Sequence, residues 1–266
     1  MPKIKANGIE LFYEQHGWNK DADVLVLSNG VLMSTASWAF QTPVFSKHYR
    51  VLLYDCRGQW QSDHPKEPYS MELHADDLAA LLNALGIARA HIGGISYGAE
   101  VSMVFALKYP ALVKSLILAS TVSQIDPVLR GIVQAWIEAA KRKDPDLFYS
   151  VTYPSNFSER WIAANPQLLE QARGRYATLD LDAVVNLCEA FLKLNITSEL
   201  HRIAAPTLLM VGEEDALKPR RYADVIAREI PRAEYVIIPC SGHALSWEQP
   251  GVFNSLIIGF LKQHPF

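Results

Sequence analysis

Short apolar runs alternate with amphipathic stretches along most of this chain. The runs expected to form strands cover residues 9–14, 24–28, 51–54, 91–95, 115–120, 207–211 and 235–238. The later runs are apolar without interruption, which is typical of parallel strands that are buried on both faces. Strands that alternate with helices in this way predict a doubly wound α/β sheet.

Signals at helix ends support this pattern. Ser70 is expected to cap the N-terminus of a helix that Gly86 ends. Near the C-terminus, apolar residues recur at i, i+3, i+4, i+7 and i+8 from Phe253, and Pro250 lies just inside the start of that helix. Both helices therefore have one apolar face that can cover the sheet.

Residues 122–203 interrupt the alternation, because they contain helical pattern but no convincing strand. Roughly 80 residues are too many for a simple connection, whose usual length is about 4–6 residues. We predict an α/β core formed by residues 1–121 and 204–266 and a helical cap formed by residues 122–203. The cap is expected at the C-terminal edge of the sheet, where ligands bind in such folds.

Composition excludes several classes of function. With 25 basic and 28 acidic residues among 266, the formal net charge is −3, which gives no basic field for nucleic acid or an anionic membrane. The N-terminus lacks the apolar region of a secretory signal, and no run approaches the ~20 apolar residues of a membrane span. Cys56, Cys188 and Cys240 are far apart and form no disulfide or zinc pattern. We expect a soluble, cytoplasmic protein and leave its oligomeric state open.

The sequence from His91 to Ala99 carries the main chemical signal. It contains G-x-S-x-G as Gly94, Ser96 and Gly98, directly after a predicted strand and at the start of a predicted helix. Small residues two positions before and after the serine let strand and helix approach closely. The turn directs the serine hydroxyl out of the sheet, beside the free N–H groups of the helix. The motif predicts a nucleophilic serine, and a glycine-rich turn without chemistry is the alternative.

A serine needs a general base to act as a nucleophile at neutral pH. Asp215 follows the predicted strand 207–211, and His243 follows the predicted strand 235–238. Both residues are therefore expected at the same edge of the sheet as Ser96. The order serine, aspartate, histidine is that of α/β hydrolases.

Other residues compete for these roles. Glu213 and Glu214 are carboxylates adjacent to Asp215, which is preferred because it lies further into the loop. His91 begins a predicted buried strand. The remaining histidines, among them His74, are interpreted as surface or loop residues.

The chain resembles α/β-hydrolase fold enzymes, and its pattern is most similar to the 3-oxoadipate enol-lactonase-like esterases. The resemblance covers nearly the whole core and includes the serine turn and residues 27–30, 54–58, 68–70, 76–78, 212–215, 242–243 and 248–250. It implies an eight-stranded, mostly parallel sheet with the cap inserted after the sixth strand. It also implies that the backbone N–H groups of Val31 and Tyr97 form an oxyanion hole.

The chain departs from the family pattern at three places. Asn29 stands where many relatives have histidine, and Trp60 stands where glycine is common, which predicts a changed loop backbone or a changed pocket wall. Ala99 stands where glycine is frequent, and Glu100 follows it in the first turn of the predicted helix, where an acidic residue is favourable with the helix dipole. The chain contains no dinucleotide fingerprint, P-loop or H-E-x-x-H motif, so we expect no cofactor and no metal.

The expected activity is hydrolysis of a small carboxylic ester or lactone through an acyl-enzyme, by a carboxylesterase or lactonase. Ser96 is the expected nucleophile, His243 the general base and Asp215 the residue that orients it. Carbon–carbon bond hydrolysis or cofactor-free perhydrolysis with the same triad is one alternative. A non-catalytic protein of this fold that binds a small molecule is the other.

Large apolar side chains are expected to line the substrate pocket and to favour a substrate with aromatic or medium acyl character. The predicted lining residues are Met33, Trp38, Trp136, Phe148, Tyr149, Tyr153, Trp161 and Leu245. A substrate carboxylate would need a cation from the cap. The available arginines are Arg130, Arg160, Arg173 and Arg175.

Overall fold

The computed structural model describes residues 2–265, which form one eight-stranded sheet of order β1-β2-β4-β3-β5-β6-β7-β8. β1 and β2 pair antiparallel, β2 also runs antiparallel to β4, and the other neighbouring pairs are parallel. The strands are β1 (Lys3–Ala6), β2 (Ile9–His16), β3 (Val24–Ser28), β4 (Arg50–Tyr54), β5 (Ala90–Ile95), β6 (Val113–Ala119), β7 (Thr207–Gly212) and β8 (Ala233–Ile238). The predicted eight-stranded, mostly parallel sheet is confirmed.

The hairpin between β1 and β2 contains the strand that the apolar pattern did not locate. β1 is short and mostly exposed, so it lacks the apolar run that marks the other strands. A two-residue turn, Asn7-Gly8, joins it to β2, with φ values of 46° and 81°. Positive φ at both positions matches the twist of a tight hairpin, and an Asn-Gly pair provides it at low cost.

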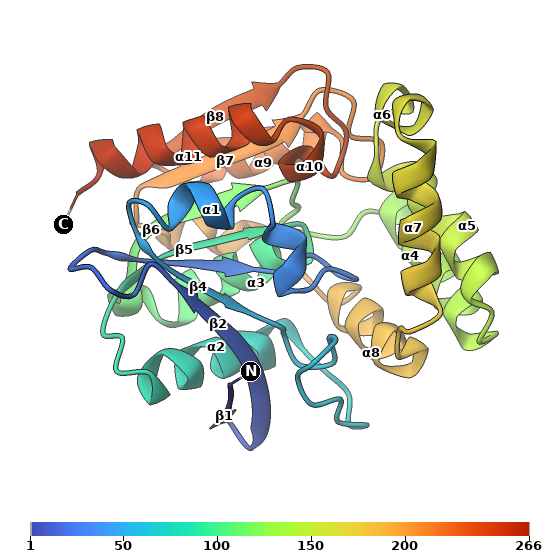
Figure 1. The fold of residues 1–266 in the computed structure, drawn as a ribbon. Helices are drawn as coiled ribbons and strands as arrows, with labels where there is room; N and C mark the ends of the chain where they lie inside the picture. Colours follow the sequence, from blue (N-terminus) through green and yellow to red (C-terminus); the bar gives the residue numbers. More distant parts are fainter. Residues whose placement is uncertain (1, 266) are drawn as a thin grey trace.

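Helices cover both faces of the sheet (Figure 1). In β3, Val24 and Val26 contribute to the core beneath α2 (Met71–Ala84), α3 (Tyr97–Lys108) and α9 (Arg220–Glu229). The alternate residues Leu25 and Leu27 contribute to the core beneath α1 (Thr42–Phe45), α10 (Leu245–Glu248) and α11 (Pro250–Gln263). Because successive side chains of a strand point to opposite faces, the sheet supports two hydrophobic cores.

The predicted helix ends are confirmed. The Ser70 hydroxyl accepts a hydrogen bond from the backbone N–H of Leu73 at 3.1 Å and so caps α2. Gly86 follows that helix with a φ of 66°. Pro250 is the first residue of α11.

Five helices and a short 3₁₀ helix lie between β6 and β7, in the segment for which the sequence predicts a cap. Figure 1 shows α5, α6 and α7 beyond one end of the sheet, on the right. α4 packs against α8 and α5, and α5 packs against α7. The elements are α4 (Pro127–Lys141), α5 (Pro145–Asn156), α6 (Glu159–Ala164), α7 (Pro166–Tyr176), α8 (Leu181–Phe191) and η3 (Thr197–Arg202). We call this segment the cap.

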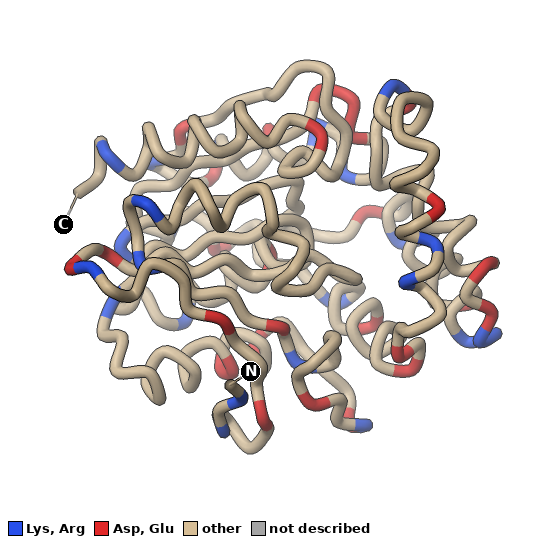
Figure 2. The backbone as a smooth tube through the Cα atoms, in the orientation of Figure 1, with Lys and Arg blue, Asp and Glu red and all other residues tan. Residues whose placement is uncertain are grey.

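Charged residues are spread along the whole chain, with basic and acidic positions interspersed (Figure 2). No helix in residues 2–265 combines the length and the apolar character that crossing a bilayer would need.

His74 differs from its sequence interpretation as a surface or loop residue. It lies on the inward face of α2, fully buried between the rings of Tyr69 and Tyr97. Neither of its ring nitrogens has a hydrogen-bond partner among the described residues. Burial, together with the nearby Arg57 guanidinium, lowers the pKa of His74 to about 3. This histidine is therefore neutral in the folded protein.

Replacing His74 with phenylalanine is expected to make the protein more tolerant of acid. Since the pKa of His74 is about 3 in the folded chain and about 6.5 in the unfolded chain, the unfolded chain binds the proton more readily between these values. Wild-type stability is therefore lost as pH falls below about 6.5, by about 2 kcal/mol at pH 5 from this residue. Urea unfolding at pH 7.5 and pH 5 measures the loss, which should be about 2 kcal/mol smaller in His74→Phe. Equal losses in the two proteins would contradict the assignment.

Candidate active site

Ser96 occupies a strained turn between β5 and α3. Its φ of 54° and ψ of −124° are unusual for a residue with a side chain and require support from the surrounding structure. A Cβ atom on Gly94 would lie 2.4 Å from the backbone of Gly98, and one on Gly98 would lie 2.1 Å from the carbonyl oxygen of Ser28. Both glycines of the G-x-S-x-G motif are therefore needed for the close approach of β5, α3 and β3.

His243 and Asp215 form a buried hydrogen-bonded pair at the ends of β8 and β7. The distance from His243 Nδ1 to Asp215 Oδ2 is 2.9 Å, and Asp215 Oδ1 accepts from the backbone N–H groups of Leu217 and Lys218 at 3.0 and 2.7 Å. Burial acts to raise the pKa of the Asp215 carboxyl, but His243 and these hydrogen bonds hold it below its usual value. An ionised carboxylate only accepts, so the imidazole proton lies on Nδ1 and leaves Nε2 free to take a proton.

The two neighbouring glutamates lie elsewhere. The Glu213 carboxylate accepts from the backbone N–H of Cys240, and Glu214 forms an ion pair with Arg160 at 3.2 Å. Ligand atoms of Glu213, Glu214 and Cys240 come within 4.8 Å of one another near the surface. Both glutamates already have partners, so this cluster carries no metal assignment.

The loop after β3 and the start of α3 each place a free N–H group next to Ser96. Among the described residues, none accepts a hydrogen bond from the N–H of Val31 or Tyr97. Both residues line a cavity together with Ser96. The Gln59 amide donates to the carbonyl oxygen of Gly30 at 2.9 Å and so helps to hold the loop in place. Two free donors beside a serine hydroxyl can bind an oxyanion.

Asn29, where relatives often have histidine, connects this loop to a buried carboxylate. Its side-chain amide donates to Asp55 at 3.1 Å and accepts from the indole N–H of Trp38 at 2.8 Å. Asp55 also accepts from the backbone N–H groups of Thr35 and Gln61. Burial raises the pKa of Asp55 to about 6 despite these hydrogen bonds. Asn29 therefore supplies a hydrogen-bonded anchor for the loop.

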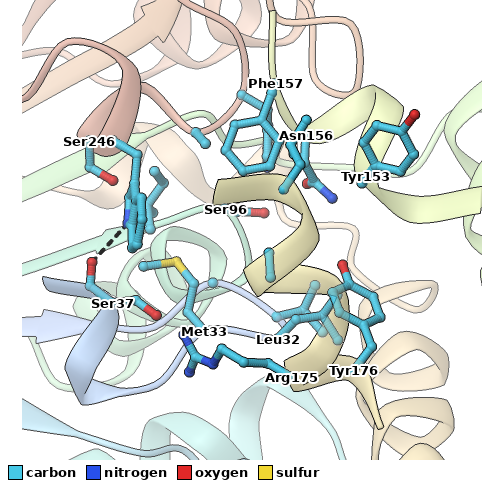
Figure 3. Close-up of a pocket in the computed structure, with 18 of the residues that line it drawn as sticks. Leu32, Met33, Ser37, Ser96, Tyr153, Asn156, Phe157, Arg175, Tyr176 and Ser246 are labelled. Atoms are coloured by element: carbon cyan, nitrogen blue, oxygen red, sulfur yellow. Dashed lines mark hydrogen bonds between the residues drawn. The ribbon is translucent and has the colours of Figure 1, made fainter. Parts of the chain in front are cut away.

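Two cavities meet at Ser96. The larger has a volume of about 180 Å³ and is predominantly apolar, and His243 contributes to its wall. Figure 3 shows Ser96 in this cavity, with Met33 on one side and Phe157 and Asn156 on the other. Of the predicted pocket residues, its lining includes Met33, Tyr149, Tyr153 and Trp161.

The smaller cavity also borders Ser96. Its volume of about 20 Å³ corresponds to little more than one water molecule. His243 is not among its lining residues, which include Val31, Tyr97, Val133, Trp136, Phe191 and Lys218. Trp136, predicted as a pocket residue, is therefore placed here, and its indole N–H has no hydrogen-bond partner among the described residues.

Three predicted pocket residues line neither cavity, so the prediction for them is wrong. Trp38 and Leu245 are fully buried in the core beneath α11. Phe148 is buried within the cap, where its ring contacts that of Tyr176. Large apolar residues are predicted to be buried, but the sequence does not show which buried positions border an empty space.

Trp60 forms part of the pocket wall, which is one of the two outcomes that the sequence left open. Its φ of 42° keeps a backbone conformation that favours glycine, which costs roughly 1–3 kcal/mol for a residue with a side chain. The indole N–H donates to the carbonyl oxygen of Leu32 at 3.1 Å, and the ring lines the larger cavity. The Arg175 guanidinium lies 4.6 Å from the centre of the ring.

Arg175 is the cap arginine that reaches the larger cavity. Arg130 donates to the carbonyl oxygen of Leu192, and Arg173 forms an ion pair with Asp146 at 2.7 Å. Arg160 pairs with Glu214, as described above. Of the four candidate arginines, these three line neither cavity in the described part of the chain.

Glu248 connects the cap to the loop that carries His243. Its carboxylate accepts from the backbone N–H of Gly242 at 3.0 Å and from the hydroxyl of Ser158 at 2.5 Å. On the other side of His243, the backbone N–H of Ala244 donates to the carbonyl oxygen of Asn156 at 2.9 Å. Hydrogen bonds thus connect Gly242 and Ala244, the two neighbours of His243, to the segment between α5 and α6.

Lys218 and Glu100 form an ion pair next to Ser96. The sequence analysis did not predict this pair. For Glu100 the sequence indicated only a favourable interaction with the helix dipole. In the structure it is also fully buried and lies 2.8 Å from the Lys218 ammonium. The ammonium also donates to Ser96 Oγ at 3.1 Å. A signal was present in the sequence, since Glu100 follows the serine by one helical turn and Lys218 follows Asp215 by three residues.

A serine on a strained strand–helix turn, with a histidine–aspartate pair at the ends of later strands of the same sheet, defines a hydrolase of the α/β type. The family model described as "alpha/beta hydrolase fold" matches residues 23–250. The chain belongs to this family, as its sequence motifs predict.

Individual proteins are similar to the chain over nearly its full length. A protein of Pantoea ananatis named "Putative carbamate hydrolase RutD" is 30% identical over 262 residues, which cover 93% of this chain and 92% of that protein. The structure of MGS-M2, an α/β hydrolase enzyme from a Medee basin deep-sea metagenome library, matches with a TM-score of 0.95 and 33% identity, covering 100% of this chain and 98% of that one. The enol-lactonase from Burkholderia xenovorans LB400 matches with a TM-score of 0.91 and 27% identity, covering 98% and 100%. These similarities support a hydrolase of this fold.

Proposed function

We propose that the protein is a serine hydrolase that cleaves a small carboxylic ester or lactone through an acyl-enzyme. The observation that carries the proposal is the position of Ser96, where two cavities meet beside the His243–Asp215 pair and the free N–H groups of Val31 and Tyr97. This arrangement supplies a nucleophile, a base and an oxyanion site to one substrate carbonyl.

In the first half of the reaction, His243 Nε2 takes the proton of the Ser96 hydroxyl as Oγ attacks the carbonyl carbon. Asp215 keeps the imidazole in the correct tautomer and stabilises its positive charge. The N–H groups of Val31 and Tyr97 stabilise the oxyanion by about 3–4 kcal/mol each. The intermediate then collapses, and His243 protonates the leaving alcohol oxygen.

In the second half, water attacks the ester of Ser96. His243 takes a proton from the water molecule, and the resulting oxyanion occupies the same two N–H groups. Collapse of this intermediate breaks the bond between carbon and Oγ. His243 returns a proton to Oγ, and the carboxylic acid leaves.

The position of His243 distinguishes the roles of the two cavities. His243 must protonate the leaving alcohol, so the alcohol group belongs in the larger cavity, whose wall includes this histidine. The acyl chain then points into the smaller cavity. The proposed substrate therefore combines a short acyl group with a larger, apolar alcohol group, which revises the medium acyl chain expected from the sequence.

The names of two similar proteins suggest two substrate classes, carbamates and lactones, to compare with the cavities. The name of the Pantoea relative refers to carbamate, and the unsubstituted carbamate ion has no alcohol group that could fill the larger cavity. The enol-lactonase acts, by its name, on a cyclic ester. An ester or lactone uses both cavities, and Arg175 in the wall of the larger one would suit a substrate whose alcohol side carries a carboxylate.

A series of p-nitrophenyl esters together with a fluorophosphonate probe tests the proposal. We expect the probe to label Ser96, and kcat/KM to fall at least tenfold between the acetyl and octanoyl esters, because extra methylene groups overfill the smaller cavity. Labelling without ester hydrolysis would favour a diketone or peroxide as co-substrate on the same residues. Absence of labelling would favour a binding protein.

Replacing Trp136 with alanine is expected to reverse this preference for short chains. The substitution enlarges the smaller cavity, so kcat/KM for the octanoyl ester should rise at least tenfold relative to that for the acetyl ester. The matched control is Trp161→Ala in the larger cavity, which should alter the preference for the alcohol group and keep the order of acyl chains. An unchanged chain-length profile in Trp136→Ala would show that the acyl group lies elsewhere.

A further inference from the structure

A buried ion pair touches the nucleophile. Lys218 lies in the loop after β7, three residues beyond Asp215, and Glu100 lies in the first turn of α3. The two residues are 3% and 0% exposed. The Lys218 ammonium is 3.1 Å from Ser96 Oγ and 2.8 and 3.0 Å from the two carboxylate oxygens of Glu100.

The hydrogen bonds of this pair are complete. An ammonium has three N–H donors, and the three acceptors at Lys218 are the serine oxygen and the two oxygens of Glu100. Glu100 accepts two further hydrogen bonds, from the hydroxyl of Thr121 and the backbone N–H of Val122. A neutral amine would leave the Glu100 carboxylate buried without a counter-charge, which is strongly unfavourable. The three acceptors and the buried carboxylate partner therefore fit a charged ammonium that donates to Ser96.

We propose that Lys218 is a catalytic residue of this site, whose ammonium stabilises negative charge on Ser96 Oγ. This inference rests on the proposed function, because it assigns a role at the same nucleophile. Glu100 is the positioning residue that keeps the ammonium charged and fixes it beside the serine oxygen.

The stabilisation acts at both steps in which the serine oxygen gains charge. During attack, the proton of Ser96 moves to His243 Nε2, an electron pair of Oγ forms the bond to the carbonyl carbon, and the carbonyl electron pair moves to the oxyanion. During release of the acid, the bond between carbon and Oγ breaks, its electron pair stays on Oγ, and His243 returns the proton. Lys218 keeps its three protons throughout.

The surroundings make this hydrogen bond stronger than it would be in water. The centre of the Phe191 ring lies 4.5 Å from the ammonium nitrogen, and Leu129 and Val133 line the same small cavity. A charge-assisted hydrogen bond gains strength where water is excluded. A buried ion pair adds little to stability compared with apolar residues of the same volume. The position of this pair is therefore better explained by the reacting oxygen that it contacts.

The double variant Lys218→Met/Glu100→Gln removes both charges together. We expect the rate constant for fluorophosphonate labelling of Ser96 and the kcat for p-nitrophenyl acetate to fall about 10- to 100-fold, with KM changed less than about threefold. Thermal unfolding of the same samples shows whether each variant is folded. Should the double variant not fold, Lys218→Met alone is measured, in which Glu100 can be neutralised by a proton.

A matched control removes a second buried ion pair that does not contact the serine. Arg57 and Asp77 are joined by hydrogen bonds of 2.7 and 2.8 Å, and both are buried. In Arg57→Met/Asp77→Asn, thermal unfolding shows whether the protein is folded, and the labelling rate and the kcat of the folded protein should stay within about twofold of wild type.

Two results would overturn the proposal, and they are distinguishable. If the folded Lys218 variant labels and turns over at the wild-type rate while the wild type is labelled at Ser96, the role of Lys218 is wrong and the serine hydrolase proposal stands. If the wild type itself is not labelled at Ser96, the proposed function fails, and the role of Lys218 fails with it.

Discussion

Replacing Ser96 with alanine is expected to lower kcat for p-nitrophenyl acetate at least a thousandfold, with the fold intact. The substitution removes the only protein atom that bonds to the acyl carbon in the proposed mechanism. The free N–H groups of Val31 and Tyr97 still bind the substrate carbonyl, so a small residual rate above that of water is expected. Steady-state kinetics and circular dichroism on the same sample measure the two effects.

Ser102→Ala is the matched control for this result. Ser102 lies on the same helix as Ser96 and is buried, and its hydroxyl donates to the carbonyl oxygen of Gly98 at 2.7 Å. The two variants lose the same atom, but Ser102 lines neither cavity in the described structure. Its kcat should stay within a few-fold of wild type. Retention of more than about a thousandth of wild-type turnover by Ser96→Ala would exclude Ser96 as the nucleophile.

Replacing Asp215 with asparagine is expected to lower kcat by roughly a thousand- to ten-thousandfold. The Asp215 carboxylate fixes the proton of His243 on Nδ1 through the 2.9 Å hydrogen bond. An asparagine amide can donate to Nδ1, which places the proton on Nε2. Nε2 then cannot accept the proton of Ser96. Steady-state kinetics at neutral pH give the loss.

Glu213→Gln and Glu214→Gln are the controls, because they make the same change from acid to amide at adjacent positions. The Glu213 carboxylate accepts from the backbone of Cys240, and Glu214 pairs with Arg160, so neither reaches the imidazole. Both variants should keep kcat within about twofold of wild type. A loss in either that matched the loss in Asp215→Asn would move the role of the acid to that glutamate.

The framework of the fold was predictable because it depends on strong local signals. Uninterrupted apolar runs mark β3 to β8, and the Ser70 cap and Gly86 mark the ends of α2. The turn at Ser96 was equally readable, since the close approach at Gly94 and Gly98 tolerates no side chain. These features are specified by a few adjacent residues each.

The details of the site were less predictable because they depend on contacts between distant segments. Trp38 and Trp136 are both large and buried, but only the folded chain shows that one anchors Asn29 while the other borders a cavity. Lys218 and Glu100 are separated by 118 positions in the sequence. Each residue has an ordinary explanation in its own segment. The ion pair forms only when the fold brings the loop after β7 next to α3.

Glu248 couples the motion of the cap to the integrity of the site. The start of α6 cannot move away from the sheet without breaking the hydrogen bonds that Ser158 and Gly242 make to this carboxylate. The same movement would pull on the loop that holds His243 against Asp215. If the larger cavity opened at this end to admit a ligand, His243 would thus lose its position against Asp215. A route beside α7, where Arg175 lines the cavity, would leave these hydrogen bonds and the position of His243 unchanged.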